Sequence, residues 1–226
     1  NMDMRKKILK ENIIAWCFLL PFLFFFIGFL LYPIIKGVEL SLFDAILGGK
    51  SEFIGLANYR DMFQDKAFWE ALFNTLFFVV ISTPAIVLIG FAFALVINST
   101  LKGRTFIRTC FFSPYVLSMS VVTGLWIFIF QPYTGLITQL TMKLGVGEMY
   151  WLNTKWLVWI AILITTVWWT VGFNMILFLA GLQDIPDEIY EAAKIDGASS
   201  GQSLFKITIP MLKSTISLVI LLQTIA

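Results

Sequence analysis

Four long stretches of the chain contain no charged residue, and they constrain the fold more than any other feature of the sequence. They cover residues 12–35, 71–101, 109–142 and 156–183. Each stretch exceeds the roughly 20 apolar residues that a helix needs to cross about 30 Å of hydrocarbon. Only 13% of the residues are charged, roughly half the usual share of about 25% in soluble domains. We therefore expect a chain embedded in a lipid bilayer.

The sequence predicts an all-α fold, a polytopic transmembrane helix bundle that forms a single transmembrane domain over residues 1–226. Helices are expected because the bilayer core holds no water to satisfy exposed backbone groups. The last apolar run stops at Ala226, part-way across a membrane, and the chain begins with Asn1 rather than Met. We expect a piece of a longer protein with six or more spans. The five visible spans are predicted at about 13–32, 68–97, 113–130, 156–179 and 214–226, the last one truncated.

The basic residues indicate the orientation of the chain in the membrane. They gather before the first predicted span and between the second and third spans, at Arg5, Lys6, Lys7, Lys10, Lys102, Arg104 and Arg108. The positive-inside rule makes both segments cytoplasmic, so the N-terminus is predicted to be cytoplasmic. The net charge of +2 is too small to indicate a nucleic-acid partner. The cysteines, Cys17 and Cys110, have no metal-ligand spacing, and neither a metal site nor a catalytic residue is predicted.

A charged segment at residues 181–213 follows the fourth predicted span and is cytoplasmic by the parity of crossings. Asp184 and the residues after it resemble a helix start, and Ile185, Ile189 and Ala192 recur at helical spacing as an apolar stripe. Gly197 is expected to end that helix in a backbone conformation hostile to larger residues, and a second helix follows. Such a helix-turn-helix suits docking into a groove of another protein. The alternative is a helix that rests on lipid headgroups. The acidic edge of this helix disfavours that alternative, because it would face anionic lipid.

Within this segment, Glu191-Ala192-Ala193 is followed after three residues by Gly197, and nine residues later by Ile207-Thr208-Ile209-Pro210. This pattern resembles the EAA loop in the permease subunits of ABC importers, except that Ile209 replaces a leucine. From roughly Phe53 onward the chain is similar to the binding-protein-dependent sugar permeases of the maltose and glycerol-3-phosphate type. The further motifs that carry this resemblance are Phe-Ile-Gly-Leu-Ala-Asn-Tyr at 53–59, Asn-Thr-Leu at 74–76, Phe-Ser-Pro-Tyr at 112–115 and Gly-Phe-Asn-Met at 172–175.

The resemblance implies a permease subunit in the bacterial inner membrane that translocates a sugar or oligosaccharide delivered by an extracytoplasmic binding protein. It implies a second permease subunit and two cytosolic ATPase subunits as further partners, beside the lipid bilayer. ATP and Mg would be bound by the ATPase subunits. We therefore expect this chain to be a non-catalytic subunit that holds no cofactor. The resemblance assigns ATPase coupling to Glu188, Glu191, Ala192, Ala193, Asp196, Gly197, Ile207 and Pro210.

Apart from Glu70 at the start of the second, the predicted spans contain no acidic or basic residue, and the chain has no histidine and no G-x-x-x-x-G-K-[ST] loop. Proton-driven carriers usually place ionisable groups in the membrane, so we expect the energy to come from a partner. An ABC permease for a non-sugar solute, such as a polyamine or a phosphate ester, is the alternative. A second and less favoured alternative is a secondary carrier that works without partner subunits. A membrane enzyme would need a cluster of reactive side chains, which the sequence does not suggest.

Several residues are candidates for a substrate path. Thr166, Trp169, Thr170 and Phe173 share one helix face, where hydroxyl groups can hydrogen-bond a sugar and aromatic rings can stack on it. Threonines bonded to their own helix and a packed tryptophan would explain the pattern equally well. Further candidates are Gln223 in the last span and Tyr115, Met119, Thr123 and Trp126 in the third. We expect the fourth-span residues and Gln223 to point into a cavity near mid-membrane, shared with a second permease.

Overall fold

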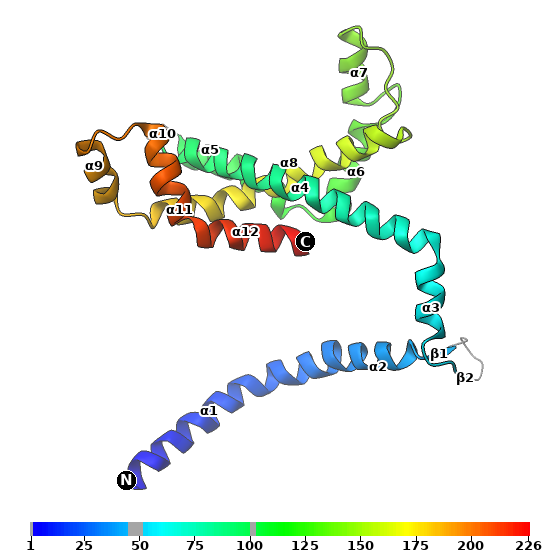
Figure 1. Ribbon diagram of the computed structural model, residues 1–226, viewed down its shortest axis with the longest axis vertical. Coiled ribbons are helices and arrows are strands. Elements are labelled where there is room, and N and C mark those ends of the chain that lie inside the picture. Colours follow the sequence, from blue (N-terminus) through cyan, green and yellow to red (C-terminus); the bar gives the residue numbers. More distant parts are fainter. Residues whose placement is uncertain (1, 45–51, 100–102) are drawn as a thin grey trace. The chain divides into compact units, whose positions relative to one another are not determined.

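The structure is a computed structural model that describes residues 2–44, 52–99 and 103–226 (Figure 1). Most of these residues are helical and very few are in strands, which confirms the predicted all-α class. The described strands are β1 (Phe43–Asp44) and β2 (Glu52–Phe53), which pair antiparallel with Phe43 opposite Phe53. The chain divides into two compact units, residues 1–73 and 74–226, called unit 1 and unit 2 below.

Unit 1 begins with one long helical run. It consists of α1 (Met2–Phe26), the π-helical stretch η1 (Ile27–Leu31) and α2 (Tyr32–Leu40), and α3 (Ala57–Gln64) follows the strand pair. The Asn58 side chain donates hydrogen bonds to the carbonyls of Ser41 (2.9 Å) and Phe43 (3.1 Å), and the hydroxyls of Ser41 and Tyr59 lie 2.7 Å apart. The motif at 53–59 therefore ties α3 to the end of α2, and this contact gives Asn58 and Tyr59 a structural role.

Unit 2 contains most of the remaining helices. α4 (Lys66–Asn98) leads into it, and α8 (Lys155–Gln183) is its other long helix. α7 and α9 lie at opposite ends of α8 (Figure 1). The other elements are α5 (Arg104–Phe112), the 3-10 turn η2 (Ser113–Val116), α6 (Met119–Ile129), α7 (Leu136–Lys143), α9 (Asp187–Ile195), α10 (Ser200–Ser203), the π-helical η3 (Leu204–Thr208), α11 (Ile209–Met211) and α12 (Lys213–Ile225).

Three helical runs in the described chain are long and apolar enough to cross a membrane: Lys10–Leu40, Lys66–Asn98 and Lys155–Gln183. Two bent pairs, Arg104–Val116 with Met119–Ile129 and Ser200–Met211 with Lys213–Ile225, raise the number to five if each pair forms one span. The members of these pairs meet at 99° and 66°. Length and composition therefore allow three to five crossings.

The third predicted span, at 113–130, takes a different course in the structure. Pro114 lies in η2, and the backbone is extended at Leu117 (ψ 141°) and Ser118 (ψ 149°) before α6 begins. Proline lacks a backbone donor and interrupts the helical hydrogen-bond ladder. The predicted helix from 113 to 130 is therefore interrupted near its start: η2 covers its first residues, and α6 is separated from α5 by a sharp bend.

The main core of unit 2 lies between α4, α8 and α12. α5 also packs on α8, because Gly172 leaves room for the backbone of Phe111: a Cβ at Gly172 would lie 1.9 Å from the Phe111 carbonyl oxygen. Such small-residue contacts let helices approach closely in membranes, where packing replaces the hydrophobic effect. The buried core residues are Ala94, Ile97, Met175, Phe178, Leu179, Leu182, Ile185, Leu212 and Val219.

Candidate functional site

The segment between α8 and α12 (residues 184–212, the interhelical loop) contains the helix-turn-helix predicted from the sequence. Its first helix, α9, carries Asp187 and Glu188 in the first turn and Lys194 in the last, charges that stabilise the helix dipole. Pro186 is the N-cap residue of α9, and no side chain caps the helix. Asp184 is instead the C-cap residue of α8. The predicted role of Asp184 at the helix start is therefore wrong, because α8 extends further than expected.

The turn after α9 confirms the prediction made for Gly197. This residue has a φ of +78°, a left-handed conformation that side chains disfavour. Its N–H donates to the Lys194 carbonyl (3.1 Å), and the Ala198 N–H donates to the Ala193 carbonyl (2.9 Å). These two bonds form a Schellman motif, which satisfies the free carbonyls at a helix end. Gly197 therefore ends α9 and reverses the chain.

A capping box starts the second arm of the loop. The Ser199 N–H donates to Gln202 Oε1 (2.8 Å), and the Gln202 N–H donates to Ser199 Oγ (3.3 Å). This reciprocal pair satisfies two N–H groups at the helix start. This capping box was not predicted from the sequence, although Ser followed three residues later by Gln is its recognised signature.

One contact holds the two arms of the interhelical loop together, and another anchors the loop to the membrane helices. The hydroxyls of Tyr190 on α9 and Thr208 on η3 lie 2.9 Å apart, and Thr208 is only 4% exposed. Ile185, 7% exposed, packs in the core with Leu182 and Leu212. Ile185 therefore does not belong to an exposed docking stripe with Ile189 and Ala192, as the helical spacing suggested. It is an anchor, because the chain leaves α8 just before it.

The residues predicted to couple with an ATPase lie mostly on the surface of the interhelical loop. Glu188, Glu191, Ala192, Asp196, Gly197 and Pro210 are exposed, whereas Ala193 and Ile207 are half-buried. A hollow of about 450 Å³ lies at the turn and is lined by Ala193, Asp196, Gly197, Ala198, Gln202, Lys206 and Ile207. The loop also exposes Ile195 (87%) and Phe205 (70%), which the sequence analysis did not select. Apolar side chains in an otherwise charged segment were the signal that could have identified them.

A second hollow, of about 240 Å³, lies between α6 and α8 and is called the substrate hollow below. It brings together five residues from the predicted substrate path: Met119, Thr123 and Trp126 from α6 and Thr166 and Trp169 from α8. The indole nitrogens Nε1 of Trp126 and Trp169 are buried and have no hydrogen-bond partner among the described residues. A buried donor without a partner costs roughly 1–3 kcal/mol. These two N–H groups are therefore unsatisfied among the described residues, and a ligand oxygen that reached them would remove this cost.

The other four candidates for the substrate path do not line this hollow. The rings of Tyr115 and Phe173 stack on each other with centroids 4.6 Å apart, and Thr170 Oγ1 donates to a carbonyl of its own helix, that of Thr166 (2.8 Å). Gln223 Nε2 on α12 donates to Asn174 Oδ1 on α8 (3.3 Å). For these residues the structure shows local packing and internal hydrogen bonds.

Asn174 is a polar core residue that the sequence analysis did not select for itself. It is fully buried, and its Nδ2 donates to the Thr170 carbonyl (2.9 Å) while its Oδ1 accepts from Gln223 (3.3 Å). An amide in an apolar helix must find partners. The position of Asn174 in the Gly-Phe-Asn-Met motif at 172–175 was the signal that could have identified it from the sequence.

Helices long and apolar enough to cross a membrane, packed around a shared core with a structured loop between two of them, define a polytopic membrane protein. The described residues contain no group of three or more His, Cys, Asp or Glu side chains that could hold a metal ion. Residues 56–226 match the family described as "Binding-protein-dependent transport system inner membrane component", and the chain belongs to this family. It is therefore an inner membrane component of a transport system, as the sequence motifs predicted.

Individual relatives agree with this assignment. The chain is 38% identical over 209 residues to the probable ABC transporter permease protein YurN of Bacillus subtilis (strain 168), covering 90% of this chain and 71% of that protein. It is 33% identical over 217 residues to the trehalose/maltose transport system permease protein MalF of Thermococcus litoralis, covering 96% of this chain and 74% of that protein.

Solved structures show the same fold. The chain resembles a bacterial ABC transporter involved in the import of the acidic polysaccharide alginate, with a TM-score of 0.84 and 26% identity over 96% of this chain and 74% of the other. It also resembles a bacterial alginate ABC transporter in complex with an alginate pentasaccharide-bound periplasmic protein, with a TM-score of 0.84 and 26% identity over 96% and 73% of the two chains. The predicted ABC permease fold is therefore confirmed.

Proposed function

We propose that this chain is the membrane-spanning permease subunit of an ATP-driven importer that translocates a sugar or oligosaccharide delivered by an extracytoplasmic binding protein. The family supports the dependence on a binding protein. The relatives named for trehalose, maltose and alginate support a carbohydrate substrate. A second permease subunit completes the pathway, two ATPase subunits bind ATP and Mg, and the N-terminus of this chain is cytoplasmic.

The substrate hollow is the single observation that carries the carbohydrate assignment. The Trp126 and Trp169 N–H groups can donate to sugar hydroxyls, and their rings can stack on the apolar C–H face of a sugar. Thr123 and Thr166 add hydroxyl groups that donate and accept. At about 240 Å³ the hollow lies just below the roughly 300–1,000 Å³ typical of small-molecule sites. It therefore contacts one or two rings of a longer substrate, and the second permease completes the passage.

The interhelical loop docks on the ATPase in this proposal. α9 presents the carboxylates of Glu188 and Glu191 on its surface, and the exposed Ile195 follows at its end. Such a helix fits an apolar groove with a basic rim on another protein. The Tyr190–Thr208 contact holds the two arms of the loop together, and the buried Ile185 packs with Leu182 of α8 and Leu212 at the start of α12. A movement of the docked loop would therefore be transmitted to the helices beside the substrate hollow.

The carbohydrate assignment is tested by replacing Trp169 with phenylalanine, which keeps an aromatic ring and removes the N–H donor. Uptake of a labelled sugar by proteoliposomes that contain the full complex should fall roughly fivefold to tenfold, because one hydrogen bond to substrate is lost. The Trp156→Phe variant is the matched control, since Trp156 is 68% exposed at the start of α8 and lies outside the hollow.

Unchanged uptake in the Trp169→Phe variant would contradict the role of the hollow. Transport of a polyamine or a phosphate ester, with no sugar transported, would favour the non-sugar alternative instead. In both variants the subunits should assemble as in the wild type, because neither substitution touches the interhelical loop.

A further inference from the structure

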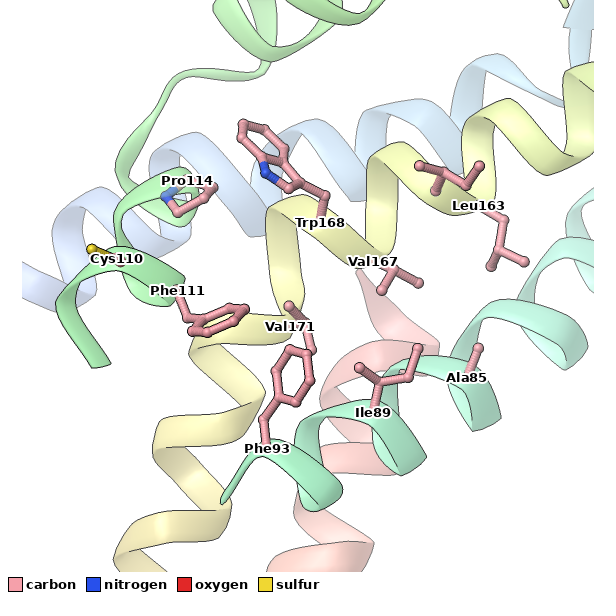
Figure 2. A pocket seen from close by; sticks show the side chains of 11 residues that line it. Ala85, Ile89, Phe93, Cys110, Phe111, Pro114, Leu163, Val167, Trp168 and Val171 are labelled. Carbon is pink, nitrogen blue, oxygen red and sulfur yellow. The ribbon is translucent and has the colours of Figure 1, made fainter. Parts of the chain in front are cut away.

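An apolar groove of about 540 Å³ lies on unit 2 between α4, α5 and α8 (Figure 2), and it shares no lining residue with the substrate hollow. Phe93 of α4 and Phe111 of α5 meet across it, with ring centroids 4.7 Å apart. Val167 and Val171 of α8 form the side between them. No charged side chain of the described residues lines the groove.

The groove is accessible at the surface of unit 2. Cys110 is exposed, and Phe111 and Ile164, which also line the groove, are each 38% exposed. Its volume falls within the roughly 300–1,000 Å³ of small-molecule sites. In hydrocarbon, a groove with this lining needs an apolar occupant, because a void forfeits the van der Waals contacts of its walls.

Two arginines lie on the Phe111 side of α5, toward its N-terminus, and neither is among the residues that line the groove. Arg104, Arg108 and Phe111 recur at i, i+4 and i+7, so they lie along one side of this helix. Arg104 is exposed, whereas Arg108 is half-buried and its Nε is buried without a hydrogen-bond partner among the described residues. A buried guanidinium donor calls for an acceptor, and phosphate oxygens match its fork geometry.

We infer that the groove binds an acyl chain of an anionic phospholipid whose phosphate lies against Arg108 and Arg104. Both parts of the lipid have a complement here, the acyl chain in the apolar groove and the phosphate at its basic end. The proposed orientation, on which this inference rests, places α5 at the cytoplasmic leaflet, where anionic lipids are recognised by basic pockets between helices. A protein helix in the groove would fill its apolar part and would supply no phosphate to Arg108.

The test is native mass spectrometry of the complete transporter, purified in a mild detergent from membranes that contain phosphatidylglycerol and phosphatidylethanolamine. The wild type should retain phosphatidylglycerol in preference to phosphatidylethanolamine. Arg108→Gln should lower its retention about tenfold, because a charge-assisted hydrogen bond is lost. Arg60→Gln on α3 is the matched control, since it removes an exposed arginine elsewhere and should change nothing.

A second measurement locates the lipid. A photoactivatable phosphatidylglycerol in nanodiscs should crosslink to the peptide that contains Cys110 and Phe111, and Val167→Trp, which fills the groove, should abolish that crosslink. Equal retention of both headgroups, unchanged retention in Arg108→Gln, or crosslinks confined to other peptides would overturn the inference. These outcomes leave the proposed function intact, whereas loss of the ATPase subunits from the purified wild type would contradict that function alone.

Discussion

At the scale of single residues, the conformation of Gly197 determines how the interhelical loop reverses direction. Its φ of +78° disfavours any side chain, most of all a β-branched one. Gly197→Val should therefore disrupt the turn, at a cost of about 1–3 kcal/mol, while insertion into the membrane stays normal. The expected result is weaker association with the ATPase, measured by co-purification of the subunits.

Gly201→Val is the matched control for this substitution. Neither glycine has an atom within 4 Å of the position that a Cβ would take, and only Gly197 has a positive φ. A difference between the two variants therefore isolates backbone conformation from crowding. Equal loss of ATPase binding in both variants would show that the turn geometry is not the cause.

The hydrogen bond between Asn174 and Gln223 leads to a second prediction at this scale. The fully buried Asn174 accepts from Gln223 at 3.3 Å. Gln223→Leu should lower the free energy of unfolding by about 1–3 kcal/mol, because it leaves a buried acceptor unsatisfied. Combining Gln223→Leu with Asn174→Leu should cost less than the sum of the single changes, since both partners are then removed.

Thermal unfolding of the purified transporter, carried through this double-mutant cycle, measures the coupling. If the effects of the two single changes simply add, the residues do not interact. A large loss of sugar uptake in Gln223→Leu at unchanged stability would instead restore Gln223 to the substrate path, where the sequence placed it.

At the scale of elements, the arm between α6 and α8 contains a hydrogen-bonded pair of tyrosines. Tyr133 has a φ of +64°, and its hydroxyl lies 2.9 Å from that of Tyr150, which donates to Glu148 Oε2 (3.2 Å). The hydrogen bond with Tyr133, followed by the one with Glu148, raises the pKa of Tyr150 from 10.0 to about 12. The bond to Glu148 needs the protonated phenol of Tyr150.

Because the pKa of Tyr150 is raised on folding, its contribution to stability is complete below pH 10 and is lost as the pH rises through about 12. An ultraviolet absorbance titration of the tyrosines should therefore contain a component with a midpoint near pH 12 that is missing in Tyr150→Phe. Identical titration curves for the two proteins would contradict the hydrogen-bonded pair.

Hydropathy predicted most of the helical elements because the bilayer sets their length, but it could not predict the bend of α5 and α6. Hydropathy does not distinguish extended from helical backbone, so it could not predict that Leu117 and Ser118 are extended. Pro114, just before them, was the available signal for an interrupted helix. Likewise, helical spacing placed Thr166 and Trp169 on one face of α8. The position of Thr123 and Trp126 of α6 opposite them depends on how α6 packs against α8. The substrate hollow therefore could not be predicted from the sequence of one helix. The burial of Ile185 also depends on tertiary contacts, those with Leu182 and Leu212.

At the scale of the molecule, unit 2 joins a surface that can dock on a partner to a hollow that can hold a substrate. The interhelical loop is tied together through Tyr190 and Thr208, and Asn174 and Gln223 link the two helices that it connects. This chain of contacts offers a physical connection between the docking surface proposed for the loop and the helices beside the substrate hollow.

The most direct measurement is ATP-dependent uptake of a labelled sugar by proteoliposomes that contain the complete transporter and its binding protein, with either wild-type chain or Glu191→Lys. Glu191 is exposed on α9, and a lysine there would oppose a basic partner surface. We expect wild-type uptake only when ATP is present, and uptake reduced at least tenfold in Glu191→Lys, which corresponds to about 1.4 kcal/mol or more. Glu148→Lys, far along the chain in the α6–α8 arm, should behave as the wild type. Sugar uptake by the wild type without ATP, or unchanged ATP-driven uptake in Glu191→Lys, would contradict an ATP-coupled permease that docks through its interhelical loop.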